Sequence, residues 1–180
     1  NLVQYNLDID TDIILDIGGN DGAQLIQYQN LGFKNVINFE SADNICEISK
    51  KNGVPVINQF FNESTVKATI KEGSVKLINA SGVFFHLEEL HSVINAINYC
   101  LKDDGVFVVT GGNRGVGFEA ARVLLRQGHT VIILCRNQSR GQEAVQALQA
   151  MTGNKSCSFA RVDLTDYESI LLFVQDMKDK

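Results

Sequence analysis

A short apolar run that passes through a glycine-rich loop into an amphipathic stretch occurs twice in this sequence, and this unit strongly limits the fold. Asp12–Ile17 leads into the loop 18–22, and Gly105–Thr110 leads into the loop 111–117. Glycine suits a strand that turns sharply into a helix, because it tolerates positive φ and lets the backbone approach a ligand. The free N–H groups at such a helix start favour a polar or anionic ligand. The sequence therefore predicts an α/β protein with two cofactor loops.

The rest of the 180 residues alternates in the same way between short apolar runs and longer helical patterns. The expected strands are Asp12–Ile17, Asn35–Glu40, Val54–Asn58, Val75–Ala80, Gly105–Thr110, Thr130–Cys135 and Ser156–Val162. The expected helices are Gly22–Leu31, Ala42–Asn52, Leu87–Leu101, Gly117–Gln127, Arg140–Met151 and Tyr167–Met177. This alternation predicts a doubly wound, Rossmann-like parallel sheet of about seven strands with helices on both faces.

The expected strand order is 3-2-1-4-5-6-7. Right-handed crossovers after the fifth strand, with their helices on one face, add the last two strands at that edge. A single point of divergence is then predicted between the first and fourth strands, above Gly18 and Ala80, where ligands of such sheets bind.

The overall charge and the cysteines limit the partners and the compartment. The formal net charge is −5, which argues against nucleic acid as the main partner. No apolar run approaches the roughly 18 residues that cross a bilayer, and residues 1–10 lack a signal-peptide pattern. None of the four cysteines forms a Cys-x-x-Cys pair, so we expect reduced thiols. We therefore expect a cytoplasmic protein without a membrane partner, and the sequence leaves its oligomeric state open.

The first glycine loop has the acidic residues of a ribose-binding unit. Asp16 ends the first strand region, and Glu40 ends the second strand, where a carboxylate can accept hydrogen bonds from both ribose hydroxyls. A plain strand–helix turn is the alternative for a glycine loop alone. The complete strand–loop–helix–strand–acid context favours the cofactor site.

The stretch "LDIGGNDG" is similar to motif I of S-adenosylmethionine-dependent methyltransferases. Together with "NFESADN", "NQFFNE" and the run to "DDGVFVV", it resembles the sugar C-methyltransferases over about residues 13–109. The resemblance implies that Asp16, Gly18 and Gly22 shape the pocket for the methionine part, and that Glu40 holds the ribose. It also implies a cofactor, S-adenosylmethionine or S-adenosylhomocysteine.

The same resemblance assigns the remaining walls of that pocket. It places Phe60 and Phe61 near the adenine, and Ala80, Ser81 and Gly82, with His86, beside the methyl group. Ser81-Gly82 departs from the Asn-Asn that is usual in the family, and His86 is the candidate catalytic residue. His86 and His91 also suggest a metal, but five positions do not put two imidazoles on one helix face and no third ligand is evident. We therefore expect no metal site.

The second loop reads Thr110-Gly111-Gly112-Asn113-Arg114-Gly115-Val116-Gly117, which is the pattern T-G-x-x-x-G-x-G between a strand and a helix. Its glycines let backbone amides approach a pyrophosphate. Arg136 follows the next strand, and with Arg114 it can bind a 2′-phosphate. Surface charges are the alternative for either arginine taken singly.

The stretch from "VVTGGNRGVG" to "DLTDYESI" closely resembles short-chain dehydrogenases/reductases of the retinol-dehydrogenase-like branch, over about residues 106–180. The resemblance implies that Arg136 selects NADP, and that Asp163 and Leu164 flank the adenine. It also implies contacts to the phosphates and ribose from Thr110, Gly111, Asn113, Arg114, Gly115 and Gly117. The family's catalytic Ser and Tyr-x-x-x-Lys are not in this sequence, since Tyr167 is followed four residues later by Leu171.

The two resemblances share the strand 105–110, which predicts a chimera with a methyltransferase-like segment, 1–109, and a dehydrogenase-like segment, 106–180, in one continuous sheet. The expected function is an S-adenosylmethionine-binding core joined to an incomplete, weakly NADP-binding segment, with little or no catalysis and no reductase activity. The alternatives are an NADP(H)-binding dehydrogenase fragment and a chimeric scaffold without enzymatic function.

Overall fold

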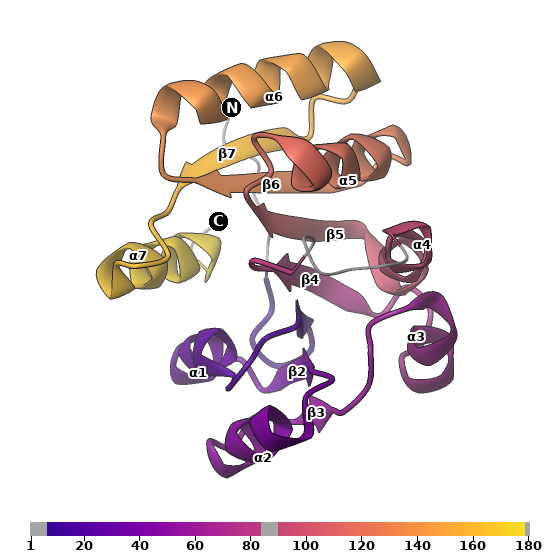
Figure 1. The fold of residues 1–180 in the computed structure, drawn as a ribbon, viewed down its shortest axis with the longest axis vertical. Helices are drawn as coiled ribbons and strands as arrows, with labels where there is room; N and C mark the ends of the chain where they lie inside the picture. Colours follow the sequence, from indigo (N-terminus) through magenta and orange to yellow (C-terminus); the bar gives the residue numbers. More distant parts are fainter. Residues whose placement is uncertain (1–6, 84–89, 179–180) are drawn as a thin grey trace.

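The computed structural model describes residues 7–83 and 90–178, and it contains one parallel sheet of seven strands (Figure 1). The strand order β3-β2-β1-β4-β5-β6-β7 agrees with the predicted order. The predicted fold class, a Rossmann-like α/β sheet with helices on both faces, is confirmed. The strands are β1 (Ile13–Ile17), β2 (Asn35–Phe39), β3 (Val56–Ile57), β4 (Val75–Ala80), β5 (Leu101–Thr110), β6 (Thr130–Cys135) and β7 (Cys157–Arg161).

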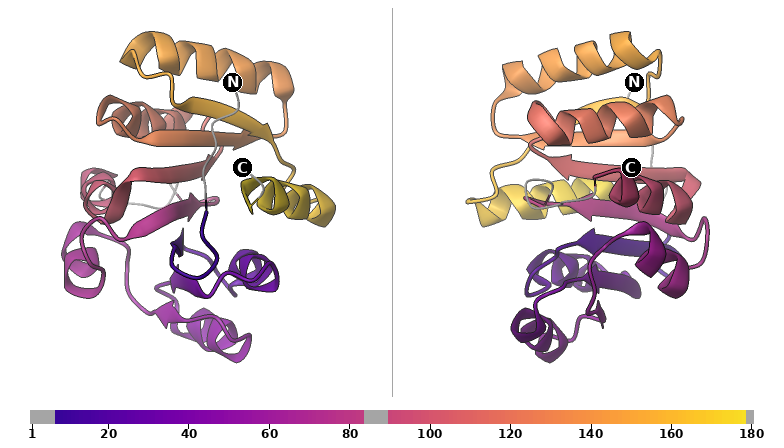
Figure 2. Two further views of the ribbon diagram at one scale, coloured as in Figure 1. Left: turned by 180° about the vertical axis from the view of Figure 1, so that it is seen from behind. Right: turned by 45° about the vertical axis from the view of Figure 1, so that its right-hand side comes forward.

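Seven helices in the described part of the chain cover the two faces of this sheet. They are α1 (Ala23–Asn30), α2 (Asp43–Lys51), α3 (Glu63–Thr69), α4 (Leu90–Cys100), α5 (Gly115–Arg126), α6 (Gln138–Thr152) and α7 (Tyr167–Lys178). The core on one face includes side chains of α3, α4, α5 and α6, and the core on the other face includes side chains of α1 and α7 (Figures 1 and 2). Burial on both faces explains why β4 has six buried residues in succession.

Three elements differ from the sequence-based prediction, and one of them is β5, which begins at Leu101 and not at Gly105. Helix α3 was not expected, because its seven residues carry no clear apolar stripe. It forms because Asn62 caps it, accepting a hydrogen bond from the Thr65 N–H at 2.9 Å, and because Val66 is fully buried. Strand β3 has two residues, whereas five were expected, because only Val56 and Ile57 pair with β2.

Helix α7 lies on the face opposite to α6, which the sequence analysis did not foresee. Its side chains Phe173, Val174 and Met177 are buried in the same core as Leu77 of β4 and Val108 of β5. The helices that follow β6 and β7 therefore lie on opposite faces of the sheet, as do the helices that follow β1 and β4. The prediction of a single point of divergence is wrong, because α7 covers an apolar part of the sheet that α1 leaves open.

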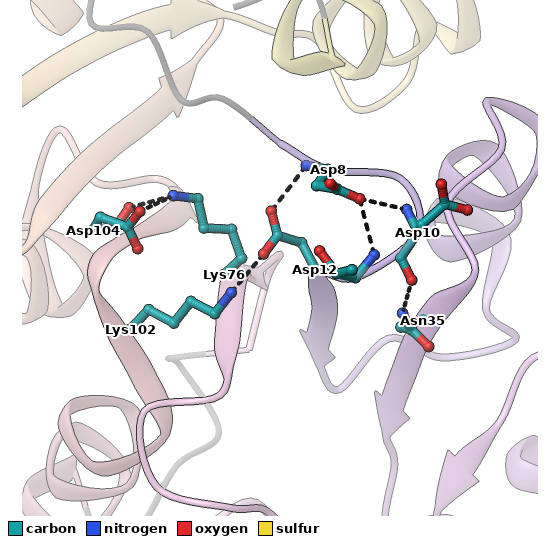
Figure 3. Close-up of polar contacts among 8 residues, drawn as sticks. Asp8, Asp10, Asp12, Asn35, Lys76, Lys102 and Asp104 are labelled. Atoms are coloured by element: carbon teal, nitrogen blue, oxygen red, sulfur yellow. Dashed lines mark hydrogen bonds and ion pairs between the residues drawn. The ribbon is translucent and has the colours of Figure 1, made fainter.

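Ion pairs connect β1, β4 and β5 near the amino ends of these strands, away from the glycine loops at their carboxyl ends (Figure 3). Lys102 Nζ lies 2.6 Å from Asp12 Oδ1, and Lys76 Nζ lies 2.6 Å from Asp104 Oδ2. Lys76 alone stands opposite residues 102–105, because Val75 pairs with Leu101 and Leu77 with Val106. The two lysines hold this bulge of β5 in place, and the lower part of β5 is thereby fixed to β1 and β4.

Candidate cofactor sites

The first glycine loop turns the chain from β1 into α1 through three residues of positive φ. These are Gly18 (φ 62°), Asn20 (φ 51°) and Gly22 (φ 83°). The Gly18 N–H donates to the Phe39 carbonyl at 2.7 Å, which ties the loop to the end of β2. A Cβ on Gly22 would lie 2.8 Å from Val54 Cγ2 and 2.9 Å from Ser49 Oγ. Glycine is therefore required at Gly22 by both its torsion and its close packing.

Asn38, a residue that the sequence analysis did not single out, holds the loop from β2. Its Oδ1 accepts from the Gly19 N–H at 3.0 Å, and its Nδ2 donates to the Asn20 carbonyl at 2.9 Å and to Ser49 Oγ at 3.1 Å. Asn38 is fully buried. An amide inside a largely apolar strand is the signal that could have pointed to this role, because buried amides are normally hydrogen-bonded.

A cavity of about 390 Å³ opens beside this loop at the carboxyl ends of β1, β2 and β4. It brings together Gly18, Glu40, Phe60, Phe61 and the segment 81–83. The complete lining is Ile17, Gly18, Asn20, Phe39, Glu40, Ser41, Gln59, Phe60, Phe61, Ser81, Gly82 and Val83. This is the predicted point of divergence, since α1 and α4, which follow β1 and β4, lie on opposite faces of the sheet.

The side chains at this cavity differ in how freely they can meet a ligand. The Glu40 carboxylate is fixed at the rim, because its Oε1 accepts from the Ala42 N–H at 2.9 Å. Phe60 is 72% exposed, whereas Phe61 is buried and packs edge-on against Phe39 with ring centroids 5.1 Å apart. Phe60 is thus the aromatic ring free to cover a ligand, and Phe61 mainly fills the core. Ala80 is buried behind the cavity wall.

Asp16 lies beneath the loop with 2% of its surface exposed. Burial, with the nearby negative charge of Glu40, raises the pKa of Asp16 to about 8. Its Oδ1 atom has no hydrogen-bond partner in the described structure. A carboxyl group in this setting is poised to respond to a positive charge placed near the loop.

The second glycine loop is also well formed. The Gly111 N–H donates to the Leu134 carbonyl at 3.0 Å, and Gly111 and Gly115 have φ of 68° and 60°. A Cβ on Gly117 would lie 3.1 Å from the Gly111 carbonyl oxygen. The tight turn into α5 that the sequence predicted is therefore present.

One hydrogen bond connects the second loop to the segment after β4 that lines the first cavity. Thr110 Oγ1 accepts from the Gly82 N–H at 2.9 Å, so the first residue of the second loop supports the wall of the first cavity. Gly82 has φ of 71°, and its neighbour Val83 would be 3.0 Å from a Cβ on Gly18. A residue of the dehydrogenase-like motif thereby helps to shape the methyltransferase-like cavity.

The residues predicted to bind a 2′-phosphate and an adenine lie at the ends of β6 and β7. Arg136 is exposed after β6, and Asp163 follows β7 on the chain that leads to α7. Hydrogen bonds from the backbone and hydroxyl of Thr165 hold the pKa of Asp163 below its usual value, with a smaller effect of Arg136. Asn113 and Arg114 line a hollow between α5 and α6 that also contains Arg140.

Helices α4 and α5 pack into one core on the same face of the sheet, with Ala96, Ile97, Ala121 and Leu124 fully buried. The helices that follow β4 and β5 therefore lie on the same face, so there is no point of divergence between these strands above Gly111. Among residues 7–83 and 90–178, no three His, Cys, Asp or Glu side chains gather as metal ligands. His86, the candidate catalytic residue, lies outside the described residues. Over the same residues, no helix combines the length and apolarity needed to cross a membrane.

The sheet order, the glycine loop and the acidic residue after β2 define an α/β protein with the architecture of a Rossmann-like methyltransferase. Residues 15–109 match the family described as "Methyltransferase domain", so the chain belongs to that family. Residues 105–180 match the family described as "short chain dehydrogenase". The chain thus joins a methyltransferase segment to a dehydrogenase segment, and the two matches overlap within β5. The predicted chimera is confirmed.

Two solved structures with a similar fold are both described as methyltransferases, and each covers most of this chain. A protein of Methanococcus maripaludis, described as a "putative s-adenosyl-l-methionine-dependent methyltransferase", is 18% identical with a TM-score of 0.50, covering 80% of this chain and 68% of that one. A geranyl diphosphate methyltransferase solved with GPP and sinefungin has a TM-score of 0.51 at 10% identity, covering 83% and 55%. These likenesses show the fold.

The curated relatives match the dehydrogenase segment. Retinol dehydrogenase 11 of Mus musculus is 39% identical over 71 residues, which cover 39% of this chain and 22% of the relative. A WW domain-containing oxidoreductase of Drosophila melanogaster is 36% identical over 73 residues, covering 39% and 18%. The chain spans about a fifth of the length of these relatives.

Proposed function

We propose that the first cavity binds S-adenosylmethionine and that the protein is a methyltransferase-type cofactor-binding protein. The observation that carries this proposal is the joint presence of the Gly18–Gly22 turn, the fixed Glu40 carboxylate and the exposed Phe60 ring around one cavity. The loop packs closely on the sheet beneath it, because a Cβ on Gly19 would lie only 2.6 Å from Asn38 Oδ1. The Asp16 carboxyl group, whose Oδ1 has no partner in the described structure, lies beneath it.

In this proposal each part of the cavity has one role. Glu40 accepts hydrogen bonds from the ribose hydroxyls, Phe60 covers the adenine, and the loop amides receive the amino-acid end. When bound, S-adenosylmethionine supplies an electrophilic methyl group. The wall 81–83 then limits the approach to that group, and Thr110 holds this wall in place. The cytoplasmic location stays a prediction.

Calorimetric titration of one preparation with S-adenosylhomocysteine and with NADPH tests the proposal. We expect S-adenosylhomocysteine to bind with one site per chain and more tightly than NADPH. Heat from NADPH alone would support the dehydrogenase-type function in its place. The absence of heat from both ligands would favour a scaffold without a cofactor.

Replacing Glu40 with alanine should weaken the binding of S-adenosylhomocysteine by at least about tenfold, or 1.4 kcal/mol, because charge-assisted hydrogen bonds to the ribose are lost. Glu40→Gln should recover part of this loss, since the amide oxygen still accepts. Glu47→Ala is the matched control, because Glu47 is an exposed carboxylate of α2 that does not line the cavity. Equal affinity of Glu40→Ala and wild type would contradict the assignment.

A second function, weak binding of an NADP-type nucleotide, is favoured by the divergence of α6 and α7 after β6 and β7. Arg136 and Asp163 lie at the two strand ends that diverge there, beside the well-formed second loop. This geometry suits the adenosine-phosphate half of the cofactor. The packing of α4 against α5 leaves no corresponding divergence above Gly111 for the nicotinamide half. We therefore expect weak binding, with 2′-phosphorylated nucleotides preferred.

Arg136→Ala should abolish the preference for 2′-phosphorylated over unphosphorylated nucleotides, a change of about tenfold for the loss of one arginine–phosphate pair. Fluorescence competition with 2′,5′-ADP and 5′-AMP gives the ratio directly. Arg126→Ala is the control, since Arg126 is an exposed arginine in the last turn of α5. A preference that survives in Arg136→Ala would assign the 2′-phosphate to another residue.

A further inference from the structure

Three polar residues form a row across the middle of the sheet, directly beneath the first glycine loop. In the register of the sheet, Asp16 of β1 is the partner of Asn38 of β2 and of Asn79 of β4. All three are buried, with exposed fractions of 2%, 0% and 0%. Parallel partners in register point to the same face, which here is the face that α1 covers. Polar side chains at three matched positions of a buried sheet are costly unless they are hydrogen-bonded.

The hydrogen bonds of this row are distributed unevenly. Asn38 is satisfied by the loop and by Ser49. Asp16 Oδ1 and both side-chain atoms of Asn79 have no partner in the described structure, and neither does the hydroxyl of Tyr28, which α1 places over the row. A fully buried, ionised carboxylate without donors would be strongly unfavourable, because nothing replaces its lost hydration.

The charges around Asp16 favour a neutral carboxyl group. Glu40, from the end of β2, is the charged residue that acts on it, and no lysine or arginine of the described residues forms an ion pair with Asp16. The other groups that face it are uncharged: Asn38 from β2, Asn79 from β4 and Tyr28 from α1. Burial raises the pKa of the Tyr28 phenol as well, so it too stays neutral. Glu40 and Asp16 together thus favour a ligand that brings positive charge.

We propose that Asp16 carries a proton in the free protein and releases it when a positively charged ligand occupies the adjoining cavity, so that the site selects cationic S-adenosylmethionine over its neutral product. This inference rests on the proposed function of the first cavity. Asp16 acts through the low-dielectric interior, since its neighbours Ile17 and Gly18 line the cavity and Asp16 itself does not. S-adenosylhomocysteine lacks the sulfonium charge, so its binding leaves the proton in place.

Calorimetric titrations at pH 7 in phosphate and in Tris, whose ionisation enthalpies differ, count the protons released on binding. We expect wild-type protein to release about one proton with S-adenosylmethionine and far less with S-adenosylhomocysteine. We expect Asp16→Asn, which preserves shape, to release no proton. We also expect its preference for S-adenosylmethionine over S-adenosylhomocysteine to fall at least tenfold. Asp12→Asn is the matched control, because Asp12 is a buried aspartate at the opposite end of β1 and should leave the proton count unchanged.

The outcomes separate this inference from the proposed function. Binding of both ligands without proton release, or with equal release, overturns the role of Asp16 and leaves the cofactor assignment standing. Binding of neither ligand overturns both. An infrared difference spectrum gives an independent readout: the C=O stretch of a protonated carboxyl should disappear when S-adenosylmethionine binds, and should be absent throughout in Asp16→Asn. Persistence of that band in the wild-type complex also overturns the inference.

Discussion

Gly22→Ala should lower the free energy of unfolding by about 2 to 5 kcal/mol and should abolish measurable cofactor binding at the first cavity. Two costs combine at this residue. Alanine is strained at φ 83°, and its Cβ would lie within 2.9 Å of Val54 and Ser49. Relief of the overlap must move the start of α1 away from α2, and the loop amides move with it. Urea denaturation and calorimetric titration measure the two effects.

Gly73→Ala isolates the backbone part of that cost. Gly73 also has positive φ, 56°, but a Cβ there would meet nothing within 4 Å, and the residue lies away from both loops. We expect Gly73→Ala to destabilise by about 1 kcal/mol and to bind cofactor normally. Equal destabilisation of the two variants would show that the packing of Gly22 against α2 contributes little.

The contribution of Asp16 to the stability of the free protein should fall as the pH rises from about 4 to about 8. The pKa of Asp16 is 3.8 in an unfolded chain and about 8 in the folded one. Between these values the folded chain holds a proton that the unfolded chain releases, so higher pH favours unfolding. The slope that one such group adds is at most about 1.4 kcal/mol per pH unit.

Chemical denaturation at several pH values checks this prediction through the difference between wild type and Asp16→Asn. The variant has no carboxyl group to protonate, so its stability should decline less steeply, and it should become the more stable protein toward pH 8. All other titrating groups are common to the two proteins and cancel. Parallel curves for the two proteins would mean that Asp16 is ionised in the folded state despite its burial.

Several features of the site were accessible from local sequence alone. The glycines of the two loops, Glu40 after the second strand and the motif that begins at Thr110 were each identified within a single strand–loop–helix unit. In the structure two glycines of each loop adopt positive φ, and the strands end where the sequence predicted, to within one residue. Both features depend on only a few neighbouring residues. The alternation of strands and helices was sufficient for the sheet order, since right-handed crossovers leave few alternatives.

Other features depended on which strands pair and on which face each helix covers. Asn38, Asp16 and Asn79 are more than 20 residues apart in sequence, and they meet because the register of β2, β1 and β4 sets them opposite one another. The same holds for the bond between Gly82 and Thr110. The face chosen by α7 was decided by the apolar surface of β4 to β6 that α1 leaves uncovered. Local patterns therefore specified the elements and loops, whereas the buried polar row and the second divergence arose from non-local packing, which no single segment encodes.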